Sequence, residues 1–143
     1  MDALKVLLPV DLQDRQSALN EVAKAMQYLA DRSVKMHFLS ILPGKPVPLI
    51  GSLMPSEDLV SALAVLEEEL LLLVKEALPQ LEGFTVRALE GSIHKEILKY
   101  ASAVDADLIV LPSHSHSKVE NILIGSVTSK VVEKANCSVL VVR

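Results

Sequence analysis

The chain has no tryptophan, one cysteine, two phenylalanines and two tyrosines among its 143 residues. A single cysteine, Cys137, excludes an internal disulfide and a site built from several thiolates, and we expect it to be a small buried residue. So few aromatic rings leave little on which single-stranded bases could stack. Positive charge is also scarce, because the formal net charge is −4, whereas proteins that bind the nucleic-acid backbone carry a clustered basic face. We therefore expect no nucleic-acid partner.

The chain also lacks a long uncharged run. Its longest leucine run, Leu70 to Val74, is flanked by glutamates and a lysine and is far shorter than the roughly 20 residues that a membrane span needs. The segment Met1 to Lys5 carries an acid and lacks the basic stretch, apolar core and cleavage site of a secretory signal. We therefore predict a cytoplasmic protein with no membrane insertion.

Several enzyme and switch motifs are missing as well. The sequence has no Gly-x-Gly-x-x-Gly, no Gly-x₄-Gly-Lys-Ser/Thr and no Gly-x-Ser-x-Gly, so it lacks the turns of the usual dinucleotide, P-loop and hydrolase sites. A receiver-type phosphoacceptor needs an acidic cluster, and Asp11 stands alone. Two histidines, His114 and His116, are two residues apart, which is weak evidence for a metal site. We expect neither a structural metal nor an enzyme with a defined catalytic residue.

What the chain does contain is an alternation of apolar segments with amphipathic ones. Half of it is hydrophobic, which is enough for one substantial core, so residues 1–143 are predicted to form a single domain. The predicted strands cover residues 4–10, 34–42, 84–89, 107–111 and 138–142. The predicted helices place apolar residues at three- and four-residue steps within Leu19 to Ala30, Ser56 to Leu78, Ile93 to Val104 and Val127 to Ala135. This order favours an α/β fold, a doubly wound five-stranded parallel sheet with helices on both faces.

Some finer expectations follow from the same periodicity. The inner faces of the first and last helices are expected to include Ala23, Ala30 and Val132. The leucines from Leu70 to Leu73 are expected to cover the sheet rather than a partner protein. The segment Pro43 to Ser56 is rich in proline and glycine, so it is predicted to be a loop.

The last third of the chain has the layout of a phosphate site. An apolar strand, Ala106 to Leu111, leads through a polar loop, Pro112 to Asn121, into Gly125-Ser126-Val127 at the head of a predicted helix. Backbone N–H groups at a helix N-terminus have no intrahelical acceptor and lie at the positive end of the helix dipole. Such a start can hold an anion without a basic side chain.

Three segments that are distant in the sequence are expected to meet beside it. Asp11 follows the first predicted strand, Ile41 and Leu42 end the second, and Pro112 to His116 follow the fourth. In an open parallel sheet, ligands collect beyond the carboxyl ends of the strands. Asp11 has two open roles at this edge, because it can accept from an adenine amino group or act only as a turn residue.

At these residues the sequence resembles the universal stress protein family, whose nucleotide-binding members carry Gly, two residues, Gly, nine residues and then Gly-Ser or Gly-Thr. The frame lies here over Pro112-Ser113-His114-Ser115, nine residues from His116 to Ile124, and Gly125-Ser126. The opening Lys5 to Asp11 and the closing Cys137 to Arg143 also resemble the ends of the family. The resemblance covers nearly the whole chain apart from the proline-rich loop.

By this similarity the strand order would be 3-2-1-4-5, with ATP or AMP, and Mg²⁺ where a triphosphate brings it, between strands one and four. In that arrangement Asp11 would face adenine, and the amides at the head of the last helix would hold the phosphates. The implied site consists of Pro9 and Val10 beside the base, Asp11, Ile41, Leu111, Pro112, His114, Ser115, Gly125, Ser126 and Val127.

Two positions depart from the family pattern, because Pro112 and Ser115 replace its first two glycines. Proline has no N–H to donate, and one lost hydrogen bond to a neutral group removes about 0.5–1.5 kcal/mol of binding.

The leading hypothesis is a stress-response protein that binds ATP or AMP as a regulatory ligand. Two alternatives stay open: a nucleotide-free dimeric adaptor that contacts a regulatory protein, and a slow ATPase that uses Ser115 with His114. The similarity also implies a homodimer paired through Ser138 to Val142.

Overall fold

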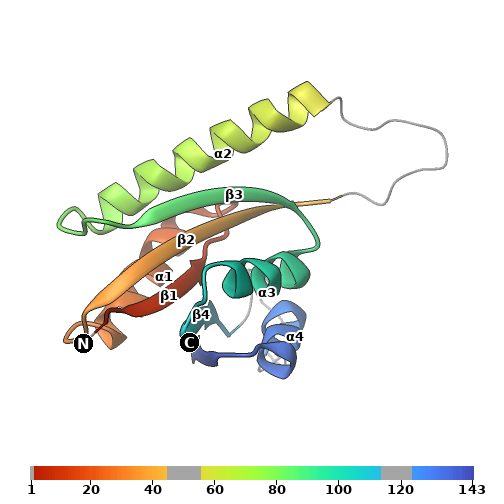
Figure 1. Cartoon of the computed structure of the whole chain (residues 1–143). Helices are drawn as coiled ribbons and strands as arrows, with labels where there is room; N and C mark the ends of the chain where they lie inside the picture. The colour runs from red at the N-terminus through yellow and green to blue at the C-terminus, as the bar shows by residue number, and fades with distance from the viewer. Residues whose placement is uncertain (1, 45–55, 114–123) are drawn as a thin grey trace.

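The structure is a computed structural model and describes residues 2–44, 56–113 and 124–143. Strands and helices alternate in the described residues, as the sequence predicts (Figure 1). In chain order they are β1 (Leu4–Pro9), α1 (Arg15–Tyr28), β2 (Val34–Pro43), α2 (Ser56–Ala77), β3 (Thr85–Gly91), α3 (Ile93–Ala103), β4 (Leu108–Pro112), α4 (Ser126–Lys134) and β5 (Ser138–Val142). The five strands form one parallel sheet in the order β3-β2-β1-β4-β5, which confirms the predicted fold class.

The sheet lies between two helical layers. Alternate residues of a strand point to opposite faces, so Val6 and Leu8 of β1 pack on one side and Leu7 on the other. The first side joins the core to α1 and α2, and the second joins it to α3 and α4. Helices on both faces account for the strongly apolar β1 and β4, because strands at the centre of such a sheet have no solvent-facing side.

The centre of the sheet opens at its carboxyl edge. β1 pairs with β2 over its whole length, whereas its pairing with β4 covers only Val6 with Leu108 and Leu7 with Ile109. The connection after β1 leads to α1 on one face, and the chain after β4 leads to α4 on the other face. A crevice at this point of divergence is where doubly wound sheets bind ligands.

The second helix agrees with the structure, whereas the predicted loop Pro43 to Ser56 is too long at both ends, because Pro43 is the last residue of β2 and Ser56 the first of α2. Residues 45–55 of the predicted loop lie outside the described residues. Of the leucine run in α2, Leu70 and Leu73 are fully buried against the sheet and Leu72 is exposed. The interpretation of this run as a sheet-covering face is confirmed for its buried members. No helix in the described part of the chain is long and apolar enough to span a membrane.

The expected inner faces of the first and last helices need correction. Ala23 and Ala30 are exposed, because the buried stripe of α1 runs through Ala18, Val22 and Ala25. In α4, Val132 is 48% exposed, whereas Thr128 and Val131 are buried. Apolar side chains at both positions suggested a wider buried face than the packing forms. The other predicted inner residues agree with the structure: Val22, Leu29 and Val131 are buried, and the partly buried Leu19, Met26, Val127 and Ala135 pack against the core.

Candidate functional site

A cavity of about 340 Å³ lies at the carboxyl ends of the central strands, bordered by the start of α4. This volume falls within the usual range of small-molecule sites. Every predicted site residue that the structure describes lines it: Pro9, Val10, Asp11, Ile41, Leu111, Pro112, Gly125, Ser126 and Val127. His114 and Ser115 lie outside the described residues. The structure thus brings three distant segments of the chain together, and their role in binding a ligand stays a prediction.

The Asp11 carboxylate lies directly after β1 and is partly used by the backbone. Its Oδ1 accepts a hydrogen bond of 3.0 Å from the amide of Gln13. This is the geometry of an Asx turn, in which a side chain takes the place of a backbone acceptor. Asp11 therefore shapes the turn that ends β1 and at the same time contributes to the cavity wall.

The helix start differs by one residue from the expected cradle. Gly125 is the N-cap of α4, and its amide donates 2.7 Å to the carbonyl of Ser113. The first helical bond runs from the Ser129 amide to the Gly125 carbonyl, at 2.9 Å. The amides of Ser126, Val127 and Thr128 are therefore the ones that precede the helical ladder. The Gly125 amide, which the sequence analysis placed in the cradle, thus already donates to the Ser113 carbonyl, one residue beyond β4.

The same region contains two buried polar residues that the sequence analysis did not single out. Thr128 is buried, and its Oγ1 donates 2.7 Å to the carbonyl of Pro112. Ser113 is also buried, and its amide donates 2.8 Å to the carbonyl of Val142 in β5. These bonds fix the end of β4 between α4 and β5. The sequence does show a threonine, Thr128, in the first turn of the predicted helix. It does not show that the hydroxyl of this threonine bonds to the carbonyl of Pro112.

Acidic side chains line the opposite part of the cavity. Glu21 of α1 and Glu69 of α2 contribute to its wall together with Asp11. Neither glutamate was among the predicted site residues, since each lies in a helix far along the chain from the motif. The cavity therefore has three carboxylates toward β1, α1 and α2, and a helix N-terminus toward α4. Its charge is distributed unevenly.

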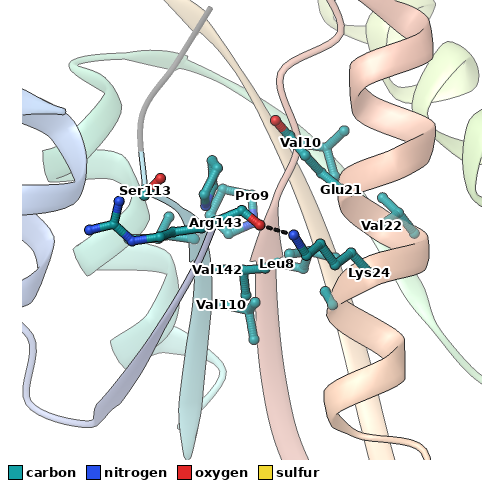
Figure 2. Close-up of a pocket in the computed structure, with 13 residues that line it drawn as sticks. Leu8, Pro9, Val10, Glu21, Val22, Lys24, Val110, Ser113, Val142 and Arg143 are labelled. Carbon is teal, nitrogen blue, oxygen red and sulfur yellow. Dashed lines mark hydrogen bonds between the residues drawn. The ribbon is translucent and has the colours of Figure 1, made fainter. Parts of the chain in front are cut away.

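A smaller cavity of about 100 Å³ adjoins the first on the side of α1 (Figure 2). The two share Pro9, Val10, Glu21, Leu111 and Pro112. Figure 2 shows the Lys24 ammonium of α1 donating to the backbone oxygen of Arg143 beyond β5. This contact ties α1 to the end of β5 and bounds the smaller cavity.

The described residues were searched for a cluster of metal ligands and for a reactive thiol. Within residues 2–44, 56–113 and 124–143, no three side chains of the His, Cys, Asp and Glu types are grouped to hold a metal ion. The pKa of the Cys137 thiol is raised by burial and by the charge of Asp107, so the thiol stays protonated and is a poor nucleophile. Cys137 lines a third cavity, formed with the carboxyl ends of α3 and α4.

Comparisons with known proteins agree with this architecture. The model of the universal stress protein family matches residues 3–143. Universal stress protein MJ0577 of Methanocaldococcus jannaschii is 30% identical, over 97% of this chain and 94% of that protein. Universal stress protein UspA from Lactobacillus plantarum superposes with a TM-score of 0.79 at 22% identity, covering 100% of this chain and 99% of that one.

A further solved structure, a universal stress protein from Archaeoglobus fulgidus in complex with dAMP, has a TM-score of 0.60 at 21% identity and covers 100% of both chains. At that identity the likeness shows the fold alone. The family model matches nearly the whole chain, and Universal stress protein MJ0577 aligns over a similar length of it. The chain belongs to the universal stress protein family.

Proposed function

We propose that this protein binds an adenine nucleotide, ATP or AMP, as a regulatory ligand in a cytoplasmic stress response. The observation that carries the proposal is the cavity in which the ends of β1, β2 and β4 meet the first amides of α4. A nucleotide needs an apolar wall for its base and a positive, N–H-rich end for its phosphates. Both are present here, and a structural relative was solved with dAMP.

We expect the parts of a nucleotide to lie along the cavity in a definite order. Pro9, Val10 and Ile41 offer the apolar surface for the base, and Asp11 lies beside them to accept from its amino group. The ribose follows near Pro112. The phosphates face Ser126 and Val127, whose amides precede the helical ladder. Mg²⁺ would accompany a triphosphate, bound by phosphate oxygens and water rather than by a protein cage.

Isothermal titration calorimetry with ATP and AMP tests the proposal. Gly125→Val places a branched side chain at the cavity edge while its backbone, at φ −69° and ψ 162°, suits any residue. We expect this variant to lose nucleotide binding and to keep its circular dichroism spectrum. The matched control is Ser129→Val on the exposed side of the same helix, which should bind like the parent. Unchanged affinity in Gly125→Val would place the ligand elsewhere.

Failure of the unmodified protein to bind either nucleotide would favour the second candidate, a nucleotide-free adaptor. One observation favours that candidate. Pro112 has no amide to offer, and its carbonyl already accepts from Thr128. The adaptor would act through contacts with a regulatory protein.

We also propose that the protein is a homodimer paired through β5. This strand is an edge of the sheet, bonded to β4 on one side, and it carries partly buried Val139, Leu140, Val141 and Val142. An apolar edge strand is an aggregation hazard unless it is covered, and a two-fold copy of itself covers it symmetrically. Size-exclusion chromatography with light scattering should give twice the chain mass at micromolar concentration. A monomer would contradict the pairing.

A further inference from the structure

Helices α3 and α4 cover only part of their face of the sheet. On this face Leu7 and Leu39 are buried in one cluster with Ile97 and Ala101 of α3. Figure 1 shows both helices to the right, away from the amino-terminal parts of β2 and β3 at the left. No helix of the described residues therefore lies over the amino-terminal part of this face, and the side chains of the strands form its surface there.

Basic side chains occupy this uncovered part, which we call the basic face. Its members are Lys5 of β1, Lys35 and His37 of β2 and Arg87 of β3. Each of them lies two or four residues before an apolar residue of the α3 cluster on its own strand, namely Leu7, Leu39 or Leu89. Alternate residues of a strand share one side, so all four side chains lie on the side of α3. Two of them, Lys5 and Arg87, are exposed, and the other two are partly buried.

The strand register brings the members of the basic face close together. Lys5 is paired with Lys35, and His37 is paired with Thr85, whose Oγ1 lies 2.7 Å from the Nδ1 of His37. Arg87 is two residues further along β3 than Thr85. With strands about 4.8 Å apart and residues about 3.3 Å apart along them, about 16 Å separates the Cα positions of Lys5 and Arg87. The pKa of His37 is lowered by burial and by the charges of Lys35 and Lys5, which agrees with this proximity.

The basic face has no ion-pair partner within the described residues. Neither Lys5, Lys35 nor Arg87 has a carboxylate within ion-pair distance there. The Lys35 ammonium donates to the carbonyl of Gly83, which is a neutral group. Asp107 borders the face just before β4, and its Oδ2 accepts a hydrogen bond of 2.8 Å from the backbone amide of Lys5. Positive charge is thus concentrated here, on a chain whose formal net charge is −4.

The shape and chemistry of the basic face favour an acidic segment of a protein as its partner. None of its four residues lines any of the three cavities described above, so the face is not a hollow for a small anion. It contains no aromatic ring for a nucleic-acid base and no apolar side chain to enter a membrane. Carboxylates at alternate residues of an extended segment are about 7 Å apart, so about three of them match the diagonal of about 16 Å.

We propose that the basic face binds an acidic segment of another protein, extended and with carboxylates at alternate residues. One end of the segment contacts Lys5 and Lys35, and the other end contacts Arg87. The Arg87 guanidinium holds a carboxylate through two parallel N–H groups. The nucleotide cavity lies at the opposite, carboxyl ends of the strands, so this interaction is independent of the proposed nucleotide function.

Fluorescence anisotropy with a labelled peptide in which glutamate alternates with serine tests the basic face. We expect binding at low ionic strength that weakens as salt is added, because salt screens exposed charges. Arg87→Glu and Lys5→Glu should each raise the dissociation constant about 3- to 10-fold, since each replaces an attraction by a repulsion. Lys75→Glu is the matched control, because it reverses an exposed charge on α2, on the other side of the sheet. Its dissociation constant should stay within about twofold of the parent value.

NMR spectra of the parent protein locate the peptide without any substitution. The backbone amides of residues 35–37 and 85–87 should shift when the peptide is added, and shifts confined to α4 would contradict the proposal. Absence of binding by the parent would also overturn it, as would an equal loss in Lys75→Glu, which would reveal an effect of net charge alone. Tighter binding of anionic phospholipid vesicles or of a single-stranded oligonucleotide at this face would assign it to a different class of partner and refute the acidic segment.

Discussion

The Thr128 hydroxyl donates a hydrogen bond of 2.7 Å to the carbonyl of Pro112, which joins the first turn of α4 to the end of β4. A second bond, from the Gly125 amide to the Ser113 carbonyl, lies beside it. The carbonyls of Pro112, the last residue of β4, and of Ser113, the next residue, therefore both accept from the start of α4. The helix N-terminus is positioned by the sheet, through residues that precede and follow the 114–123 segment.

Replacing Thr128 by valine tests this connection. Valine keeps the volume and removes the hydroxyl, so the Pro112 carbonyl loses a buried partner. We expect the free energy of unfolding to fall by about 1–3 kcal/mol in urea titrations. Thr128→Ser keeps the donor and should lose less. If Thr128→Ser destabilises more than Thr128→Val, the methyl contacts and not the hydrogen bond determine the effect.

Much of the fold was predictable because it depends on local patterns. Apolar segments of about five residues alternating with amphipathic helices leave few arrangements other than a parallel sheet with covered faces. The position of Asp11 and Ile41 beside Pro112 also followed, since the carboxyl ends of parallel strands share one edge.

The details that failed depend on contacts between distant residues. The Gly125 amide is used by the Ser113 carbonyl, and no local pattern says where that carbonyl points. Val132 reads as an inner residue of α4, yet the buried position is taken by Thr128, whose hydroxyl has a partner in β4. A polar side chain is usually buried only where it has a hydrogen-bond partner, and tertiary packing determines which group that partner is.

Asp105 allows a prediction about stability. It follows α3 with φ 52°, in the left-handed region, and the bonds from Ala106 N to Ala101 O and from Asp105 N to Ser102 O form a Schellman motif. Glycine is the usual residue at this position, and a carboxylate lies unfavourably at the negative end of the helix dipole. Asp105→Gly should raise the free energy of unfolding by about 0.5–1 kcal/mol. Asp105→Ala removes the charge but keeps the strain, so a gain equal to that of glycine would contradict the backbone explanation.

His37 links stability to pH. Its Nδ1 lies 2.7 Å from Thr85 Oγ1, and its pKa is lowered by burial and by the charges of Lys35 and Lys5. The unfolded chain therefore takes up a proton at a higher pH than the native one, so stability is complete above about pH 6.5, the ordinary value, and falls as the pH drops through the folded pKa. Urea midpoints should decrease between pH 7.5 and 5.5.

The variant His37→Gln should flatten this dependence, because glutamine can still bond to Thr85 and does not titrate. His94 also has a lowered pKa, so His94→Gln is the companion variant that removes the second contribution. A decrease that persists unchanged in the double variant would assign the effect to carboxylates instead.

The leucine run of α2 offers a matched pair of core and surface positions. Leu70 is fully buried between α2 and the sheet, and Leu72, two residues later, is 56% exposed. Leu70→Ala should lower the free energy of unfolding by about 2–5 kcal/mol, because it removes buried contacts and leaves a cavity. Leu72→Ala should change it by less than about 0.5 kcal/mol, since alanine and leucine are both good helix formers. A large loss in Leu72→Ala that depends on protein concentration would show that this face of α2 is covered in an oligomer, contrary to its exposure in the single chain.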